Sequence, residues 1–86
     1  MKCTFTREEA RILGQGVGMN FAEIDLEQFK LGLTVELEHG SHDSETNVTN
    51  DDLTLTSKIT WAHLKEIPNY YSWLIKMEAE YEYHPK

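Results

Sequence analysis

Hydrophobic residues recur at steps of three and four along most of this chain, the spacing that places them on one face of an α-helix. The clearest example is the series Leu26, Phe29, Leu33 and Leu37. No segment has the alternation and turn residues of a β-hairpin. The pattern predicts an all-α fold, a small single-domain bundle of three to four helices within residues 1–86. We expect the helices at about residues 7–13, 25–39, 52–67 and 69–80.

Two of these helices have a recognisable start. Thr6 is followed three residues later by Glu9, and Asp25 is followed three residues later by Gln28. In such a capping box the first side chain accepts from a backbone N–H of the first turn, and the second side chain reaches back to the cap residue. Both pairs therefore predict a helix that begins at the next residue.

Glycine and proline mark the predicted helix ends. Three glycines between Gly14 and Gly18 predict the end of the first helix and a loop. Gly40 is placed to be a left-handed cap of the second helix, and Pro68 ends the third. Gly32 lies inside the second helix, where it costs about 1 kcal/mol relative to alanine, so we expect another backbone to approach it closely.

Several polar residues fall on the apolar faces of the predicted helices. The third helix carries an apolar stripe made of Leu55, Ile59 and Ala62. Glu66 lies on this stripe and His63 on its edge, while Glu36 lies beside the stripe of the second helix with His39 one turn further on. If these faces pack together, two carboxylates and two imidazoles converge. We expect Glu66 and His63 to be buried and to contact the second helix.

Such a ligand set suits a divalent metal ion. A Glu and a His one turn apart on a helix form the repeating element of diiron and dimanganese sites in bundles, and one of the two helices here carries that element in reverse. The pattern predicts a zinc, iron or manganese site with further oxygen ligands from Asp52 or Tyr71. The four primary ligands are Glu36, His39, His63 and Glu66. Two alternatives stay open, a structural polar network without metal and exposure of the whole set to solvent.

Charge favours a protein partner over nucleic acid. The formal net charge is −7, which repels the phosphate backbone that a DNA- or RNA-binding protein neutralises. An acidic chain of 86 residues suits an accessory or inhibitory protein that binds a host protein through its acidic or aromatic surface. Trp61 and Leu64 lie opposite the main stripe of the third helix, and we expect them to form an exposed patch. No catalytic nucleophile is predicted; if the metal were catalytic, Glu38 or Asp52 would be the candidate base. The oligomeric state is open.

Cysteine use and hydropathy indicate a cytoplasmic setting. Cys3 is the single cysteine, so no disulfide can form within the chain. The first residues are too polar for a signal peptide, and no later segment is apolar over the length that a membrane span requires. We therefore expect a soluble protein of the cytoplasm that does not contact membranes.

Several motifs in the chain resemble a family of short bacterial and bacteriophage proteins described only as a domain of unknown function. The resemblance covers about Phe5 to Glu78 and implies one domain in a bacterial or phage cell. The matching segments are Phe5–Ala10, Leu26–Gly32, Val35–Gly40, Thr46–Asp52, Ala62–Tyr71 and Met77–Glu78. The family pattern includes the polar residues Glu36, Glu38, His39, Asp52, His63, Glu66, Tyr70 and Tyr71. The resemblance supplies no function, so the function is unknown at this point.

Overall fold

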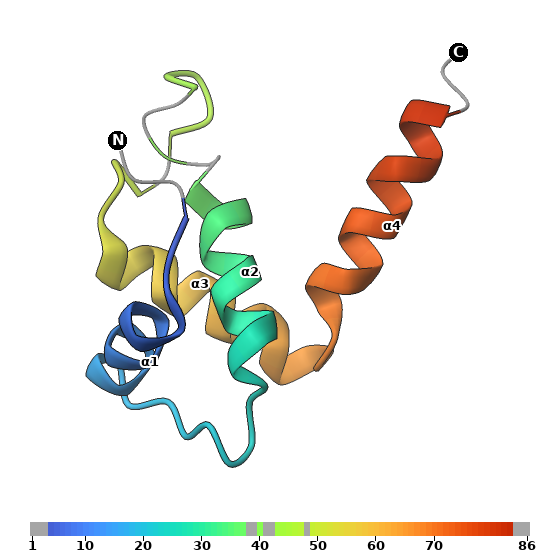
Figure 1. Ribbon diagram of the computed structural model, residues 1–86. Helices are drawn as coiled ribbons and strands as arrows, with labels where there is room; N and C mark the ends of the chain where they lie inside the picture. The colour runs from blue at the N-terminus through green and yellow to red at the C-terminus, as the bar shows by residue number, and fades with distance from the viewer. Residues whose placement is uncertain (1–3, 38–39, 41–42, 48, 84–86) are drawn as a thin grey trace.

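A computed structural model describes residues 4–37, 40, 43–47 and 49–83. It contains four helices, α1 (Arg7–Gly16), α2 (Leu26–Glu36), α3 (Leu53–Glu66) and α4 (Tyr70–Tyr83), and no strand within the described part (Figure 1). The predicted all-α fold is therefore confirmed. Within the same residues, no helix has the length and apolar character to cross a membrane.

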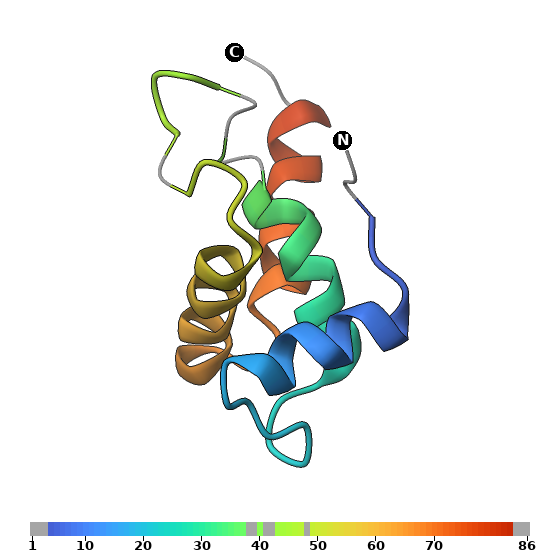
Figure 2. The ribbon, with the colours of Figure 1, turned by 90° about the vertical axis from the view of Figure 1, so that its left-hand side faces the viewer.

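Helix α2 occupies the centre of the arrangement. Helix α1 crosses the lower end of α2, and α3 lies alongside α2 (Figure 2). Helix α4 packs chiefly against α2 through its first turns and then leads away from the other three helices (Figure 1). This projection gives the molecule its unequal dimensions of 42 × 27 × 22 Å.

Side-chain caps fix the starts of three helices. Thr6 and Glu9 form the predicted capping box at α1, each accepting from the other's backbone N–H. The Asp25 carboxylate accepts two N–H groups of the first turn of α2, and Asp52 does the same for α3. The Gln28 side chain departs from the prediction, because it donates to a side chain of α4 instead of reaching back to the cap. These caps satisfy backbone donors that the helix itself leaves unpaired.

The glycine-rich segment was predicted to end α1 at residue 13, but the helix continues to Gly16. Gly14 is buried inside it, and the ring of Phe21 lies 2.4 Å from the point where a Cβ atom of Gly14 would stand. The chain leaves the helix at Gly18, whose φ of 93° is in the left-handed region that favours glycine. Gly14 is therefore a packing position, and the turn comes later.

Gly40 is not the cap of α2 as predicted, because the helix ends at Glu36 and Leu37 takes the C-cap position with a right-handed backbone. The Gly40 N–H donates to the Leu37 carbonyl, and Asp51 Oδ1 lies 2.1 Å from the position of a Cβ atom on Gly40. Asp51 and Asn50 both have a positive φ, of 63° and 51°. A side chain at position 40 would collide with Asp51, so glycine at this position allows the tight turn before α3.

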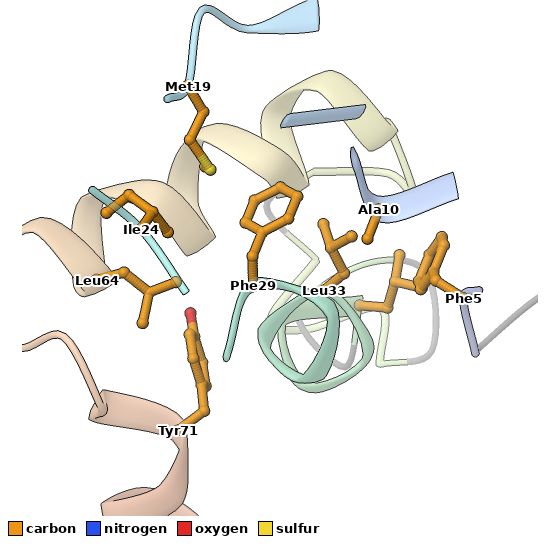
Figure 3. Packing of buried hydrophobic residues seen from close by; sticks show 9 residues of the cluster. Phe5, Ala10, Met19, Ile24, Phe29, Leu33, Leu64 and Tyr71 are labelled. Atoms are coloured by element: carbon orange, nitrogen blue, oxygen red, sulfur yellow. The ribbon is translucent and has the colours of Figure 1, made fainter. Parts of the chain in front are cut away.

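The core forms around α2. Phe29 and Leu33 are fully buried and contact residues from α1 and from the segment after it (Figure 3). Tyr71 reaches into the same core from α4 and points toward Leu64 of α3 (Figure 3). Among the described residues, the buried apolar side chains are Phe5, Ala10, Met19, Ile24, Phe29, Leu33, Leu37, Leu64 and Tyr71.

Helix α3 buries the face opposite to the predicted one. Leu55 and Ala62 are exposed and Ile59 is half-buried, so the predicted stripe faces outward. The buried residues are Thr56, Ser57, Thr60 and Leu64. The hydroxyls of Thr56 and Thr60 each donate to the carbonyl one turn earlier, at 2.8 Å, which removes most of the cost of burying them.

Gly32 explains why α3 presents small residues to α2. The Thr60 methyl lies 2.6 Å, and a ring carbon of Tyr71 2.4 Å, from where a Cβ atom on Gly32 would stand. Any larger residue at position 32 collides with side chains from both α3 and α4. The expected close approach at Gly32 is confirmed, although side chains rather than another backbone make it.

Replacement of Gly32 by alanine tests this packing. Alanine is the better helix former by about 1 kcal/mol, but the collision with two confined side chains outweighs that gain, and we expect a net loss of about 1–3 kcal/mol. Gly16→Ala is the matched control, because a Cβ atom at Gly16 meets nothing within 4 Å. Urea unfolding should show Gly32→Ala destabilised and Gly16→Ala unchanged or more stable. Equal stability of the two variants contradicts the packing.

Candidate functional site

Glu36 is a buried carboxylate at the junction of α2, α3 and α4. The Tyr71 hydroxyl donates a 2.7 Å hydrogen bond to Glu36 Oε2. The Nε2 atom of His63 lies 3.4 Å from the same oxygen. Burial of a carboxylate is costly unless it is paired, and these two groups supply pairing from two other helices.

The two partners of this carboxylate belong to a group of packed aromatic rings. The His63 ring stacks on Tyr70 with centroids 4.4 Å apart, and Tyr70 meets Tyr71 edge to face at 5.0 Å. The His63 side chain keeps 36% of its surface exposed, whereas Glu36 is almost fully buried. We call Glu36, His63, Tyr70 and Tyr71 the Glu36 cluster. It joins the base of α4 to both helices beneath it.

The environment of Tyr71 disfavours loss of its proton. Burial raises the pKa of the Tyr71 hydroxyl far above its usual value, and the hydrogen bond to Glu36 and the charge of that carboxylate raise it further. Tyr71 therefore acts as a permanent hydrogen-bond donor to Glu36 in the folded protein.

The structure brings together only part of the predicted metal site. His63 contacts Glu36 as expected, and Tyr71 joins them, but Glu66 is exposed to solvent, so its predicted burial is wrong. The reason is the rotation of α3, which turns the face with Glu66 outward. Asp52 caps α3 and is exposed.

The remaining predicted ligand, His39, lies outside the described residues, as do Glu38 and Cys3. Within the residues that the structure describes, no group of three His, Cys, Asp or Glu side chains is close enough to hold a metal ion. Of the predicted ligands that the structure describes, Glu36, His63 and the possible further ligand Tyr71 lie together. Metal binding stays a prediction of the sequence.

The exposed aromatic surface also differs from the predicted one. Leu64 is 1% exposed, so it cannot share a surface patch with Trp61, which is half-buried beneath the Lys65 ammonium. Instead, α4 exposes Trp73, Met77 and Tyr81 to 57, 58 and 67%. Their spacing of four residues is visible in the sequence and could have revealed this surface.

A family model described as "Protein of unknown function (DUF5661)" matches residues 10–80, most of the chain. The chain belongs to the DUF5661 family. The matched range includes the whole Glu36 cluster and the first eleven residues of α4. The search of curated proteins and the search of solved structures found no match to this DUF5661 protein. Its function therefore has to be inferred from its own geometry, and the bacterial or phage setting stays a prediction.

Tyr71→Phe tests the Glu36 cluster of the DUF5661 protein. The variant keeps the ring beside Gly32 but removes the donor to Glu36, which should cost about 1–3 kcal/mol because a buried acceptor loses its partner. Tyr81→Phe is the control, since Tyr81 is 67% exposed. Urea unfolding at neutral pH should destabilise only the first variant. An unchanged Tyr71→Phe protein contradicts the assigned hydrogen bond.

The raised pKa of Tyr71 predicts a loss of stability in alkaline solution. Above the usual tyrosine pKa of about 10, the unfolded chain releases a proton that the folded chain retains, so rising pH favours unfolding. Below that pH the contribution of Tyr71 is fully present. Unfolding free energies measured across this range should fall more steeply for the wild type than for Tyr71→Phe. Parallel curves for the two DUF5661 proteins contradict the prediction.

Proposed function

We propose that this protein is a binding module that docks another protein through helix α4. The observation that carries the proposal is an apolar stripe on α4 whose outer part is exposed to solvent within the described residues. The stripe contains the exposed Trp73, Met77 and Tyr81 and, at its base, Tyr70 and Leu74, which are half-buried against the core. These positions follow the three- and four-residue steps of one helical face. Isolated exposed apolar residues are ordinary, but a contiguous set on one face is typical of an interaction site.

The stripe continues beyond the helix into a shallow apolar groove. Ile67, at the end of α3, lines this groove together with residues of α4 as far as Met77. Met77 also lines an adjoining hollow with Tyr81 and two glutamates. The two hollows share Met77, so the apolar surface runs from the α3–α4 turn to the third turn of α4. Its centre is Met77.

The stability of α4 supports the same interpretation. Every residue from Ile75 to Glu82 is exposed, so the second half of the helix has almost no tertiary packing among the described residues. Helices of this length are marginal in water unless another surface covers their apolar face. A bound partner would supply that cover. The Glu36 cluster fixes the first turn of α4 against the other helices. The direction of α4 is therefore set before binding, which lowers the conformational entropy that binding costs.

This proposal keeps the accessory-protein hypothesis and relocates its surface. The sequence placed the aromatic contact at Trp61 and Leu64, and the burial of Leu64 removes that surface. Helix α4 carries the replacement. We expect an accessory or inhibitory role in which the partner, rather than this chain, performs any chemistry.

Site-specific photo-cross-linking tests the docking surface. A photoreactive phenylalanine derivative in place of Met77 should cross-link to one defined protein in cells of the native host. The same derivative in place of Lys58, an exposed residue of α3, is the control. Loss of the Met77 product when Tyr81→Ser is added should confirm the stripe. Equal products at both positions, or none at Met77, contradict docking through α4.

A further inference from the structure

We propose that the partner of α4 is a basic amphipathic helix. This inference rests on the proposed docking function and adds the chemistry of the partner. Helix α4 contains three glutamates, Glu78, Glu80 and Glu82, and a single cation, Lys76. All four are exposed. An apolar face with acidic borders is complementary to an apolar face with basic borders.

The acidic borders lie on both sides of the stripe. At about 100° per residue, Glu78 and Glu80 fall on opposite sides of Met77, so each faces one edge of an approaching surface. Lys76 lies 5.1 Å from the centre of the Trp73 ring, in a cation–π contact within α4 itself. The borders therefore present mainly negative charge.

The position of the glutamates along the helix points the same way. They occupy the C-terminal half of α4, whose last turn contains no basic residue. The C-terminal end of a helix carries partial negative charge, so carboxylates there destabilise it and nearby cations stabilise it. The free chain lacks these cations within the helix. Lysine or arginine side chains from a partner would supply them at both borders.

The shape of the surface favours a helix as the partner element. The stripe from Tyr70 to Tyr81 extends over about 16 Å at a rise of 1.5 Å per residue, or about three turns. A straight rod of this length pairs side by side with a second helix of three to four turns, as amphipathic helices do when they dock. The interface is small, so we expect reversible binding.

Charge disfavours two other occupants. A second copy of the chain would place six glutamates against two lysines across a paired α4 interface. An anionic lipid surface would repel the same borders, and the formal net charge of −7 adds to this repulsion. A basic helix meets neither obstacle.

Three synthetic helical peptides test the inference. All three have the same apolar face. The residues that flank this face are lysine in the first peptide, glutamine in the second and glutamate in the third. The chain has two tryptophans, so its NMR spectrum has two indole N–H signals. We expect the lysine peptide to shift the Trp73 signal and leave Trp61 unmoved. At low salt it should bind about tenfold tighter than the glutamate peptide. Added salt should reduce this preference.

Charge reversal locates the effect on α4. The double variant Glu78→Lys and Glu80→Lys should reverse the preference, so that the glutamate peptide binds more tightly. The control is Glu23→Lys with Glu45→Lys, which makes the same change in net charge at exposed positions away from α4. The control should keep the preference for the lysine peptide. A reversal in both variants would show an effect of net charge and overturn the inference.

Other outcomes separate this inference from the proposed function. Equal binding of the three peptides, or no binding, overturns the basic partner, while a cross-link from Met77 to another protein would still support docking. Self-association that shifts the Trp73 signal with protein concentration alone overturns the basic partner and identifies a second copy as the occupant. Absence of any cross-link from Met77 counts against the docking function itself.

Discussion

The arrangement depends on the insertion of Tyr71 between α2 and α3. Its ring occupies the space that a side chain at Gly32 would fill, and its hydroxyl donates to the buried Glu36 carboxylate. The ring contact requires glycine on α2 and a small residue, Thr60, on the facing side of α3. The hydrogen bond to Glu36 fixes the first turn of α4. One side chain thus sets the rotation of α3 and the direction in which α4 leaves the bundle.

The sequence was sufficient to predict the helices but not the face that α3 buries. The capping residues and the apolar period located all four elements, because both signals are local. The buried face of α3 depends instead on what it packs against. Threonine looks polar in a sequence pattern, yet Thr56 and Thr60 satisfy their hydroxyls within the helix and are small enough to approach Gly32. The larger Leu55 is left outside.

The orientation of α3 about its axis also determines which residues of the candidate site could be predicted from the sequence. Glu36 and His63 meet as the sequence predicted, and Tyr71, predicted as a possible further ligand, contacts Glu36 as well. These residues lie where α2, α3 and α4 pack together. Glu66 was assigned to the core from the wrong face of α3 and is exposed. The four-residue spacing of Trp73, Met77 and Tyr81 indicates an apolar face in the sequence, but it does not show whether another element covers that face. The exposure of the three side chains and the path of α4 away from the other helices show that it is open within the described residues (Figure 1).

Helix α4 is anchored at its first turn by Tyr71 and, within the described residues, is unpacked in its second half. Backbone hydrogen exchange of the isolated protein, resolved by residue, tests this difference between the two ends. We expect slow exchange at Trp73 and Leu74, whose N–H groups are among the first to be hydrogen-bonded in α4, and fast exchange from Met77 to Tyr83, because local opening of an unpacked helical segment costs little free energy. Uniform slow exchange through Tyr83 would show that the stripe is already covered and would contradict the claim. Fast exchange throughout α4 would contradict the anchoring by Tyr71.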